Sequence, residues 1–517
     1  MSTARPQTAK KTRELARRGR ALLAPPPGLR RADMIAMGCI MACCFFLFQF
    51  GDLDITASFS YAYLDGHFFD FYRYNKATLA SAFVIDIDYL QPIYLLLAAW
   101  NVPMKLLGLT GHAAQGIYKL SAVELAWNKL LLVLFLALCC VTVYKIARLI
   151  TQEDKPAKLC MFLFAASPLT VFAVFIFGGY DIFGLTFMML GLHAFLRHEH
   201  WRFILWFALA IPFKYFAIFP FLPLLLLDEK NVWKILRGLG LVAAPSLVCL
   251  ALTLLDSSST EGEALRQLGS LQLRKANLGP ITTPALFSLG YLAICLFAHF
   301  KRPGGDRRER QKYAVMLSLA AITSIFFFVK WNMQWIILMA PLLALAFLFS
   351  PNKKTTLLFE TVGSTALFLR IFYIYSLVIP PDWDNLLLDP GKWDLHHRVY
   401  FLGNFWVTFP PGYGPVRGFF QPGIMSISKF VPDWILPYID LIILVCLLAP
   451  FALLFLYRKK EVQPAPALTK AEAGILRLRC YGGLAAYLLP IAVVSGLYAW
   501  VPALLEKITA IIGSSIA

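Results

Sequence analysis

The chain has 517 residues, of which 59% are hydrophobic and only 15% are charged. A soluble domain of that size carries about 25% charged residues, so the composition excludes a water-soluble globular protein and indicates a polytopic membrane protein. The net charge of +18 does not indicate nucleic-acid binding, because cytoplasmic loops of membrane proteins collect Lys and Arg. Most of the ten cysteines lie in apolar runs, and none has metal-ligand spacing with His.

The N-terminal segment 1–32 is basic and poor in acids, and no convincing signal-peptide cleavage site follows it. We interpret it as a cytoplasmic tail before an uncleaved first span. A span needs about 20 apolar residues. The clear candidates are roughly 33–50, 122–147, 158–177, 181–197, 233–255, 282–300, 312–329, 332–350, 356–379, 434–457 and 480–501.

One further apolar run, 201–227, is too long for a single span and contains Pro212 and Lys214 near its middle. We divide it into two short helices, 202–213 and 215–227, that meet at Lys214, which gives about 13 spans in all. With the N-terminus inside, this division places roughly two thirds of the Lys and Arg residues on the cytoplasmic side. A single helix would instead place the basic loop 301–312 outside.

Three external loops follow from this topology. The first, 51–121, contains an apolar segment, 90–109, that we expect to lie in the membrane interface, because a span there would invert every later loop against the charge rule. The second, 256–281, is polar. The third, 380–433, is rich in Pro, Gly, Trp and Tyr, which is typical of a structured loop over a site.

Four polar features fall on the same external face. Asp52 and Asp54 follow the first span, and Tyr180 and Asp181 lie in a short turn after Gly178-Gly179. Lys214 lies in the broken hairpin, and Lys330 and Trp331 begin another short turn, 330–335. Convergence of acids and cations at one face indicates a functional site.

Each feature also has a purely structural explanation. Acids can stand beside a membrane helix simply because water begins there, and the Gly178-Gly179 turn can join two helices with Asp181 as an N-cap. Lys214 can extend to the interface, although a buried cation between two half-helices needs an anion, such as a phosphate. Lys330 and Trp331 can belong to an ordinary interfacial belt.

The chemistry available at an external face narrows the reactions. Nucleotide sugars and ATP are absent there, and the chain has no Gly-rich loop of the P-loop type. A sugar attached to a polyprenyl phosphate can cross the membrane with its lipid. A carboxylate would then act as base on the acceptor hydroxyl, and a Lys or Arg would stabilise the departing phosphate.

The chain resembles the GT-C class of integral-membrane glycosyltransferases, and within it the bacterial relatives of GPI mannosyltransferase I. The resemblance covers roughly the first 230 residues. Three motifs carry it: Asp52-Leu53-Asp54 after the first span, Gly66 to Tyr72 followed by Arg73-Tyr74, and Phe213-Lys214-Tyr215-Phe216-Ala217-Ile218-Phe219-Pro220. Ile55 departs from the family pattern, because the eukaryotic enzymes commonly carry an aromatic residue after the second acid.

The resemblance implies an all-α polytopic GT-C fold with interfacial helices in the first external loop. It implies three parts: the tail 1–32, a catalytic transmembrane module 33–230 and a variable transmembrane module 231–517. It makes Asp52 the leading general base and Asp54 the second acid, and the reverse assignment stays open. The candidate donor-phosphate and substrate-binding residues are Lys214, Asp181, Tyr180, Arg73, Lys330 and Trp331.

The implied partners are membrane lipid, a polyprenyl-phosphate sugar such as a mannose donor, and a glycan, glycolipid or protein acceptor. We expect no nucleic acid and leave a divalent metal unassigned. The absence of Asn-x-Ser/Thr sequons and of an ER-retrieval signal favours a bacterial plasma membrane over the endoplasmic reticulum.

Three other functions remain open. A flippase of lipid-linked sugars would show two similar halves with paired broken helices, whereas this chain shows one broken hairpin and no repeat. The loop 380–433 leaves open a glycan ligase or polymerase. A non-enzymatic scaffold gives no reason for Lys214.

Overall fold

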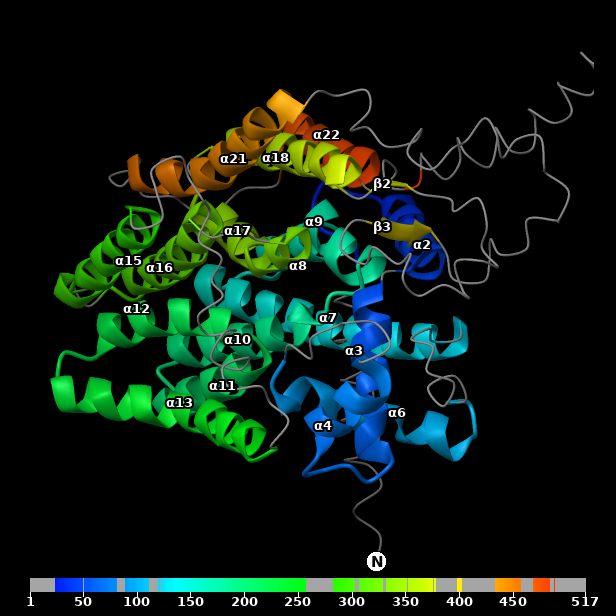
Figure 1. Cartoon of the computed structure of the whole chain (residues 1–517). Coiled ribbons are helices and arrows are strands. Elements are labelled where there is room, and N and C mark those ends of the chain that lie inside the picture. Colours follow the sequence, from blue (N-terminus) through cyan, green and yellow to red (C-terminus); the bar gives the residue numbers. More distant parts are fainter. Residues whose placement is uncertain are drawn as a thin grey trace, which may run out of the picture.

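The computed structural model describes residues 24–49, 51–80, 89–110, 120, 122–256, 282–302, 306–328, 332–350, 352–374, 376–377, 398–401, 433–456, 468–483 and 488. Helices dominate these residues, as predicted (Figure 1). The exception is a small sheet of order β1-β3-β2, in which β1 is antiparallel and β2 parallel to β3. Its strands are β1 (Phe48–Gln49), β2 (Ser376–Leu377) and β3 (Arg398–Phe401).

The first part of the chain packs the acidic motif into a helix. Its elements are α2 (Arg31–Leu47), α3 (Gly51–Leu64), α4 (Phe71–Asn75), the π-helix η1 (Lys76–Ala80), α6 (Gln91–Leu106) and α7 (Ala122–Thr151). Asp52 and Asp54 therefore lie in the first turn of α3 rather than in an irregular loop. Residues 52–64 contain no Gly or Pro that would weaken a helix. Acids in the first turn also stabilise a helix, because they interact with the positive end of its dipole. The predicted interfacial segment 90–109 also becomes a helix, α6.

The predicted span 158–177 is broken. Helix α8 (Asp154–Ala165) is followed by α9 (Pro168–Val171) and the π-helix η3 (Phe172–Ile176), and the chain bends by 46° between the two parts. Ser167 has an extended backbone, as the residue before Pro168 requires. Residues 177–180 then join η3 to α10 (Asp181–Leu196).

The predicted broken hairpin is confirmed. Helix α11 (His200–Phe213) ends at Lys214, whose φ of −155° and ψ of 109° are extended. A 3₁₀ turn, η4 (Tyr215–Ala217), and α12 (Ile218–Asp228) follow, before α13 (Val232–Leu255). Pro212 lies in the last turn of α11. The chain is therefore helical on both sides of Lys214 and extended at it.

The C-terminal part adds helices at one end of the molecule. They are α15 (Thr282–Phe300), α16 (Arg307–Phe328), η5 (Met333–Leu338), α17 (Ala340–Ala346), η6 (Phe347–Phe349), α18 (Lys353–Ile374), η9 (Asp433–Ile435), α21 (Leu436–Leu456), α22 (Lys470–Arg477) and η10 (Leu478–Gly482). Helix α18 packs against α21 and α22 (Figure 1). Most of the predicted external loops 256–281 and 380–433 lie outside the described residues.

Three helices among the described residues are long and apolar enough to cross a membrane: 123–151, 232–255 and 307–328. The bent pair α8 with α9 and η3 would make a fourth, and α10, α11 and α12 are shorter apolar helices. These elements support a membrane protein. The number of about 13 spans is not confirmed by them and stays a prediction.

Helix α10 lies at the centre of the part that carries the candidate site. It packs against α7 on one side and α11 on another (Figure 1). Gly191 allows the close approach of α11, because a Cβ atom there would lie 2.5 Å from the Phe207 ring. A rigid central helix of this kind fixes the position of its first residue, Asp181.

Candidate active site

The acidic motif at the start of α3 presents two carboxylates in different surroundings. Asp52 is half-buried, whereas Asp54 is only 4% exposed. Between them, Leu53 is fully buried and packs against Gly178, where a Cβ atom would lie 3.2 Å from its side chain. Gly178 has a φ of +71°, a conformation that favours glycine. The glycine thus shapes the turn and leaves room for the acidic motif.

The turn after Gly178 reaches the first acid through Tyr180. The Tyr180 hydroxyl donates a hydrogen bond of 3.1 Å to Oδ1 of Asp52. Tyr180 also packs edge-on against Tyr89, with ring centroids 5.0 Å apart. Tyr180 is the N-cap residue of α10, so the interpretation of Asp181 as the N-cap was wrong: Asp181 is the first residue of the helix. The Asp181 side chain is therefore available for another partner.

That partner is Lys214. Its ammonium nitrogen lies 2.6 Å from Oδ1 of Asp181, and the two side chains are 4% and 3% exposed. Gly184, one turn into α10, brings the two helices together, because a Cβ atom there would lie 3.0 Å from Cβ of Lys214. The purely structural explanation, in which Lys214 extends to the membrane interface, does not fit this buried side chain. Lys214 needs an anion, as expected, and Asp181 supplies it.

Aromatic rings surround the lysine. The Lys214 ammonium lies 5.1 Å from the ring centroids of both Tyr89 and Trp335, and 5.8 Å from that of Phe216. Tyr89 and Trp335 are half-buried, whereas Phe216 is 1% exposed. Cation–π contacts of this kind stabilise a desolvated ammonium.

The segment 330–335 contributes through its second half. Trp335 contacts Lys214, and Gln334 lies beside Gly179, where a Cβ atom would be 3.7 Å from Cβ of Gln334. Lys330 and Trp331 lie outside the described residues. The structure therefore brings together segments from all four predicted features. In the segment 330–335, the residues that make these contacts are Gln334 and Trp335.

Lys129 is a polar residue of this region that the sequence analysis did not single out. Its side chain is 1% exposed, and its ammonium donates hydrogen bonds of 2.8 Å to the carbonyl oxygens of Phe45 and Phe175. These carbonyls lie in the last turns of α2 and η3, where helix carbonyls lack intrahelical partners. The Asp54 carboxylate also acts on Lys129 electrostatically. The signal available in the sequence was a Lys near the start of the apolar run 122–147, well away from its basic end at Lys145.

Arg73 lies elsewhere. Its side chain is 60% exposed and lies 3.7 Å from the carboxylate of Asp70, and its backbone N–H is 3.4 Å from Oδ2 of Asp256. Asp70 also bonds to His67 at 3.1 Å, and this hydrogen bond lowers the pKa of Asp70. Within the described residues, these contacts do not join Arg73 to Asp52, Tyr180, Asp181 and Lys214, which together form the carboxylate–lysine cluster.

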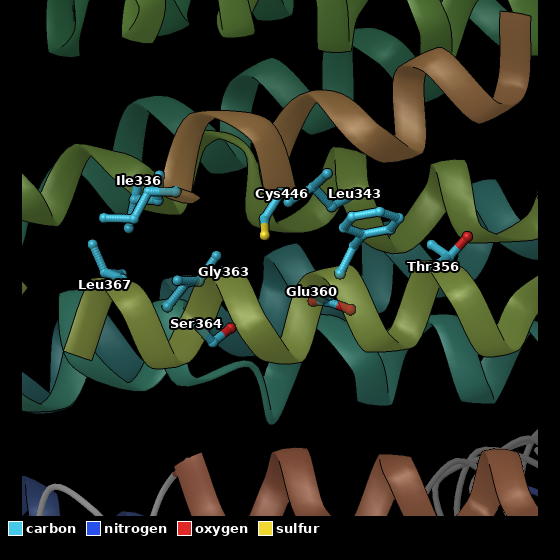
Figure 2. Close-up of a pocket in the computed structure, with 11 residues that line it drawn as sticks. Ile336, Leu343, Thr356, Glu360, Gly363, Ser364, Leu367 and Cys446 are labelled. Atoms are coloured by element: carbon cyan, nitrogen blue, oxygen red, sulfur yellow. The ribbon is translucent and has the colours of Figure 1, made fainter. Parts of the chain in front are cut away.

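A small cavity of about 10 Å³ lies between α18 and α21 (Figure 2). Its carboxylate, Glu360, pairs with the buried guanidinium of Arg479, so it is already neutralised. Ile336 of η5, the residue that follows Trp335, also lines this cavity. Within the described part of the chain, no group of three His, Cys, Asp or Glu side chains is placed to hold a metal ion.

Comparisons with known proteins give a weak structural similarity. No protein-family model and no curated protein sequence matches the chain. Among solved structures, the chain is similar to ArnT from Cupriavidus metallidurans, crystallised with undecaprenyl phosphate bound. The two are 12% identical with a TM-score of 0.40, over 87% of this chain and 77% of that one. A similarity at this level assigns neither an activity nor a residue role to this chain.

Proposed function

We propose that the protein is an integral-membrane glycosyltransferase of the GT-C type, which moves a sugar from a polyprenyl-phosphate donor to an acceptor hydroxyl. The observation that carries this proposal is the convergence of Asp52, Tyr180, Asp181 and Lys214, which come from three separate segments. Buried charge within an apolar helical protein is costly, and its usual reason is function.

The geometry favours Asp52 as the general base. It is the more exposed of the two acids in α3, and the Tyr180 hydroxyl fixes one of its oxygens. Asp52 would take the proton from the acceptor hydroxyl as that oxygen attacks the anomeric carbon of the donor sugar. The bond between that carbon and the phosphate oxygen breaks with inversion, and the polyprenyl phosphate leaves with the bonding electrons. Asp54 is buried, and we assign it as the second acid.

Lys214 is suited to the leaving phosphate. An ammonium has three N–H donors, and its contact with Asp181 leaves donors for a phosphate oxygen. Asp181 would hold the ammonium in place before the donor binds. A bound phosphate would then lie near Tyr89 and Trp335, the half-buried rings whose centroids are 5.1 Å from the ammonium. Preorganised cations stabilise the charge that develops on a departing phosphate.

The remaining assignments extend from this core. Arg73 is exposed and would contact the headgroup or the acceptor rather than the reacting atoms. Lys330 and Trp331 precede the turn that carries Trp335, and we assign them to donor binding on that basis. The resemblance of Asp52-Leu53-Asp54 and the Lys214 motif to the GPI mannosyltransferase relatives favours mannose as the sugar and a bacterial plasma membrane as the location.

The test is consumption of synthetic polyprenyl-phosphate sugars by the purified protein in detergent. Each donor carries a radiolabelled hexose, and the products are the labelled acceptor and free polyprenyl phosphate. We expect one donor, the mannose compound first, to be consumed. If no donor is consumed while the protein moves lipid-linked sugars across liposomes, the flippase interpretation replaces this proposal.

A further inference from the structure

Within the part of the chain that the structure describes, two adjacent side chains beside the carboxylate–lysine cluster carry polar atoms without a hydrogen-bond partner. They are Gln334 and Trp335, in the 3₁₀ turn η5 after α16. The unpaired atoms are the amide oxygen Oε1 of Gln334 and the indole nitrogen Nε1 of Trp335, and both are shielded from solvent. Gln334 is 4% exposed and Trp335 is half-buried.

The same kinds of side chain are paired elsewhere in the structure. The indole N–H groups of Trp100 and Trp127 each donate to the backbone carbonyl of the other residue, at 2.8 and 2.9 Å. The other buried amide side chains among the described residues each donate at least one hydrogen bond: Asn75, Gln91, Asn101, Asn128 and Gln311. Gln334 and Trp335 therefore differ from comparable residues of this chain.

The packing of η5 does not explain these polar groups. Its other residues are apolar and buried: Met333, Ile336, Ile337 and Leu338. A buried polar atom without a partner is destabilising, because it has given up its hydrogen bonds to water. An apolar side chain at position 334 would avoid this cost. A polar group that is costly in the free protein is explained when a ligand supplies its partner.

Both side chains border the buried ion pair of Asp181 and Lys214. The ring centroid of Trp335 lies 5.1 Å from the Lys214 ammonium. A Cβ atom on Gly179 would lie 3.7 Å from Cβ of Gln334 and 3.7 Å from Oδ2 of Asp181. Gln334 and Asp181 thus lie beside the same glycine, which has no side chain of its own. The unpaired atoms are therefore next to the cation that we assign to the donor phosphate.

The two unpaired atoms have complementary roles in hydrogen bonding. The amide oxygen of Gln334 accepts hydrogen bonds, whereas the indole N–H of Trp335 only donates. A hydroxyl group both donates and accepts, so hydroxyl groups can satisfy the two atoms together. A carboxylate or phosphate would suit Trp335 but offers no proton to Gln334. The ligand chemistry that fits both residues is a sugar with free hydroxyl groups.

We propose that Gln334 and Trp335 recognise hydroxyl groups of the donor sugar, with Oε1 of Gln334 accepting from one hydroxyl and the Trp335 indole N–H donating to a hydroxyl oxygen. This inference rests on the proposed function, in which Lys214 binds the phosphate to which that sugar is bonded. A site that hydrogen-bonds a substrate hydroxyl rejects analogues that lack it. The two residues would therefore determine which sugar is transferred. Hydroxyl groups of the acceptor have the same chemistry, and the test separates the two sources.

The first measurement needs no ligand. Gln334→Met removes the unpaired amide and keeps a side chain of similar length, so we expect a melting temperature equal to or above that of the wild type. The matched control is Gln311→Met, because Gln311 is 2% exposed and donates to the Leu149 carbonyl at 3.3 Å. Its melting temperature should fall. An equal fall for Gln334→Met would overturn the proposal, because the amide would then have a structural role.

The second measurement is binding to the purified full-length protein in detergent by isothermal titration calorimetry. The probes are a short-chain prenyl phosphate, the same phosphate carrying mannose, and methyl mannoside. The site variants are Gln334→Met and Trp335→Phe, the second of which keeps an aromatic ring beside Lys214. Their controls are Gln311→Met and Trp100→Phe. The quantity compared is the affinity that the sugar adds to the prenyl phosphate.

We expect this added affinity to fall about threefold to tenfold in each site variant, as the loss of one hydrogen bond predicts, and to stay unchanged in both controls. A site variant that weakens only methyl mannoside would assign the hydroxyl groups to the acceptor and overturn the donor assignment. If the wild type binds both prenyl compounds and the site variants keep the added affinity, the inference fails and the proposed function stands. A wild type that binds neither prenyl compound would overturn both.

Discussion

The ammonium of Lys214 lies 2.6 Å from the carboxylate of Asp181, and both side chains are more than nine-tenths buried. Lys214 follows the last residue of α11, and Asp181 is the first residue of α10. The ion pair therefore joins the end of one helix to the start of another. A buried ion pair adds little net stability compared with apolar residues, but breaking it leaves an uncompensated charge. Its presence here therefore favours a functional role and makes its removal measurable.

Lys214→Met should lower the free energy of unfolding by about 3–5 kcal/mol, because Asp181 is left buried without its cation. The double variant Lys214→Met with Asp181→Leu should recover much of that loss while remaining inactive in sugar transfer. Unfolding in detergent, followed by circular dichroism, measures both. The matched control is Lys105→Met, which breaks the exposed pair with Asp65 and should cost about 1 kcal/mol or less. Equal losses for the Lys214 and Lys105 variants would contradict the buried pair.

Gly178→Ala should destabilise the protein through two effects. A non-glycine residue at a φ of +71° costs about 1–2 kcal/mol, and the added Cβ would press on Leu53 at 3.2 Å. Gly66→Ala is the matched control, because Gly66 has a φ of +94° and no atom within 4 Å of the added Cβ. We expect a larger fall in melting temperature for Gly178→Ala, and a slower transfer rate only there. A larger fall in melting temperature for Gly66→Ala than for Gly178→Ala would contradict the close packing of Leu53 against Gly178.

Lys129→Met should reduce sugar transfer although Lys129 is not assigned to the substrate. The change leaves the Phe45 and Phe175 carbonyls without this donor, at about 1–3 kcal/mol for an unsatisfied buried group, and loosens the elements that position Asp54 and Tyr180. Lys145→Met, on an exposed face of the same helix, should change stability by at most about 0.5 kcal/mol. Transfer rates and unfolding midpoints of both variants check this. A Lys129→Met protein as active and stable as the wild type would remove its positioning role.

The sequence predicts the helical class and the broken hairpin because both depend on local signals. A long apolar run with Pro212 and Lys214 near its middle cannot form one span, and the structure places an extended residue at Lys214 as expected. The turn at Gly178-Gly179 is likewise local, since a positive φ requires a residue such as glycine.

Partner choice could not be predicted, because it depends on distant segments. Nothing in the sequence says that Lys214 pairs with Asp181 rather than with a bound phosphate. Trp335, from the second predicted module, completes the surroundings of Lys214, so the cluster draws on residues from both predicted modules. The acidic motif was expected in the first external loop, and the structure places it in the first turn of α3, with Leu53 packed against Gly178 and Asp52 bonded to Tyr180.

The measurement that tests the central claim most directly is transfer of radiolabelled sugar from polyprenyl-phosphate donors by three purified proteins: the wild type, Asp52→Asn and Asp65→Asn. Asp65 is an exposed acid just after the same helix and serves as the matched control. Loss of a general base lowers rates by about 100- to 10,000-fold. We predict that loss for Asp52→Asn, with Asp65→Asn as fast as the wild type. Equal rates for all three proteins would contradict the assignment of Asp52 as the base.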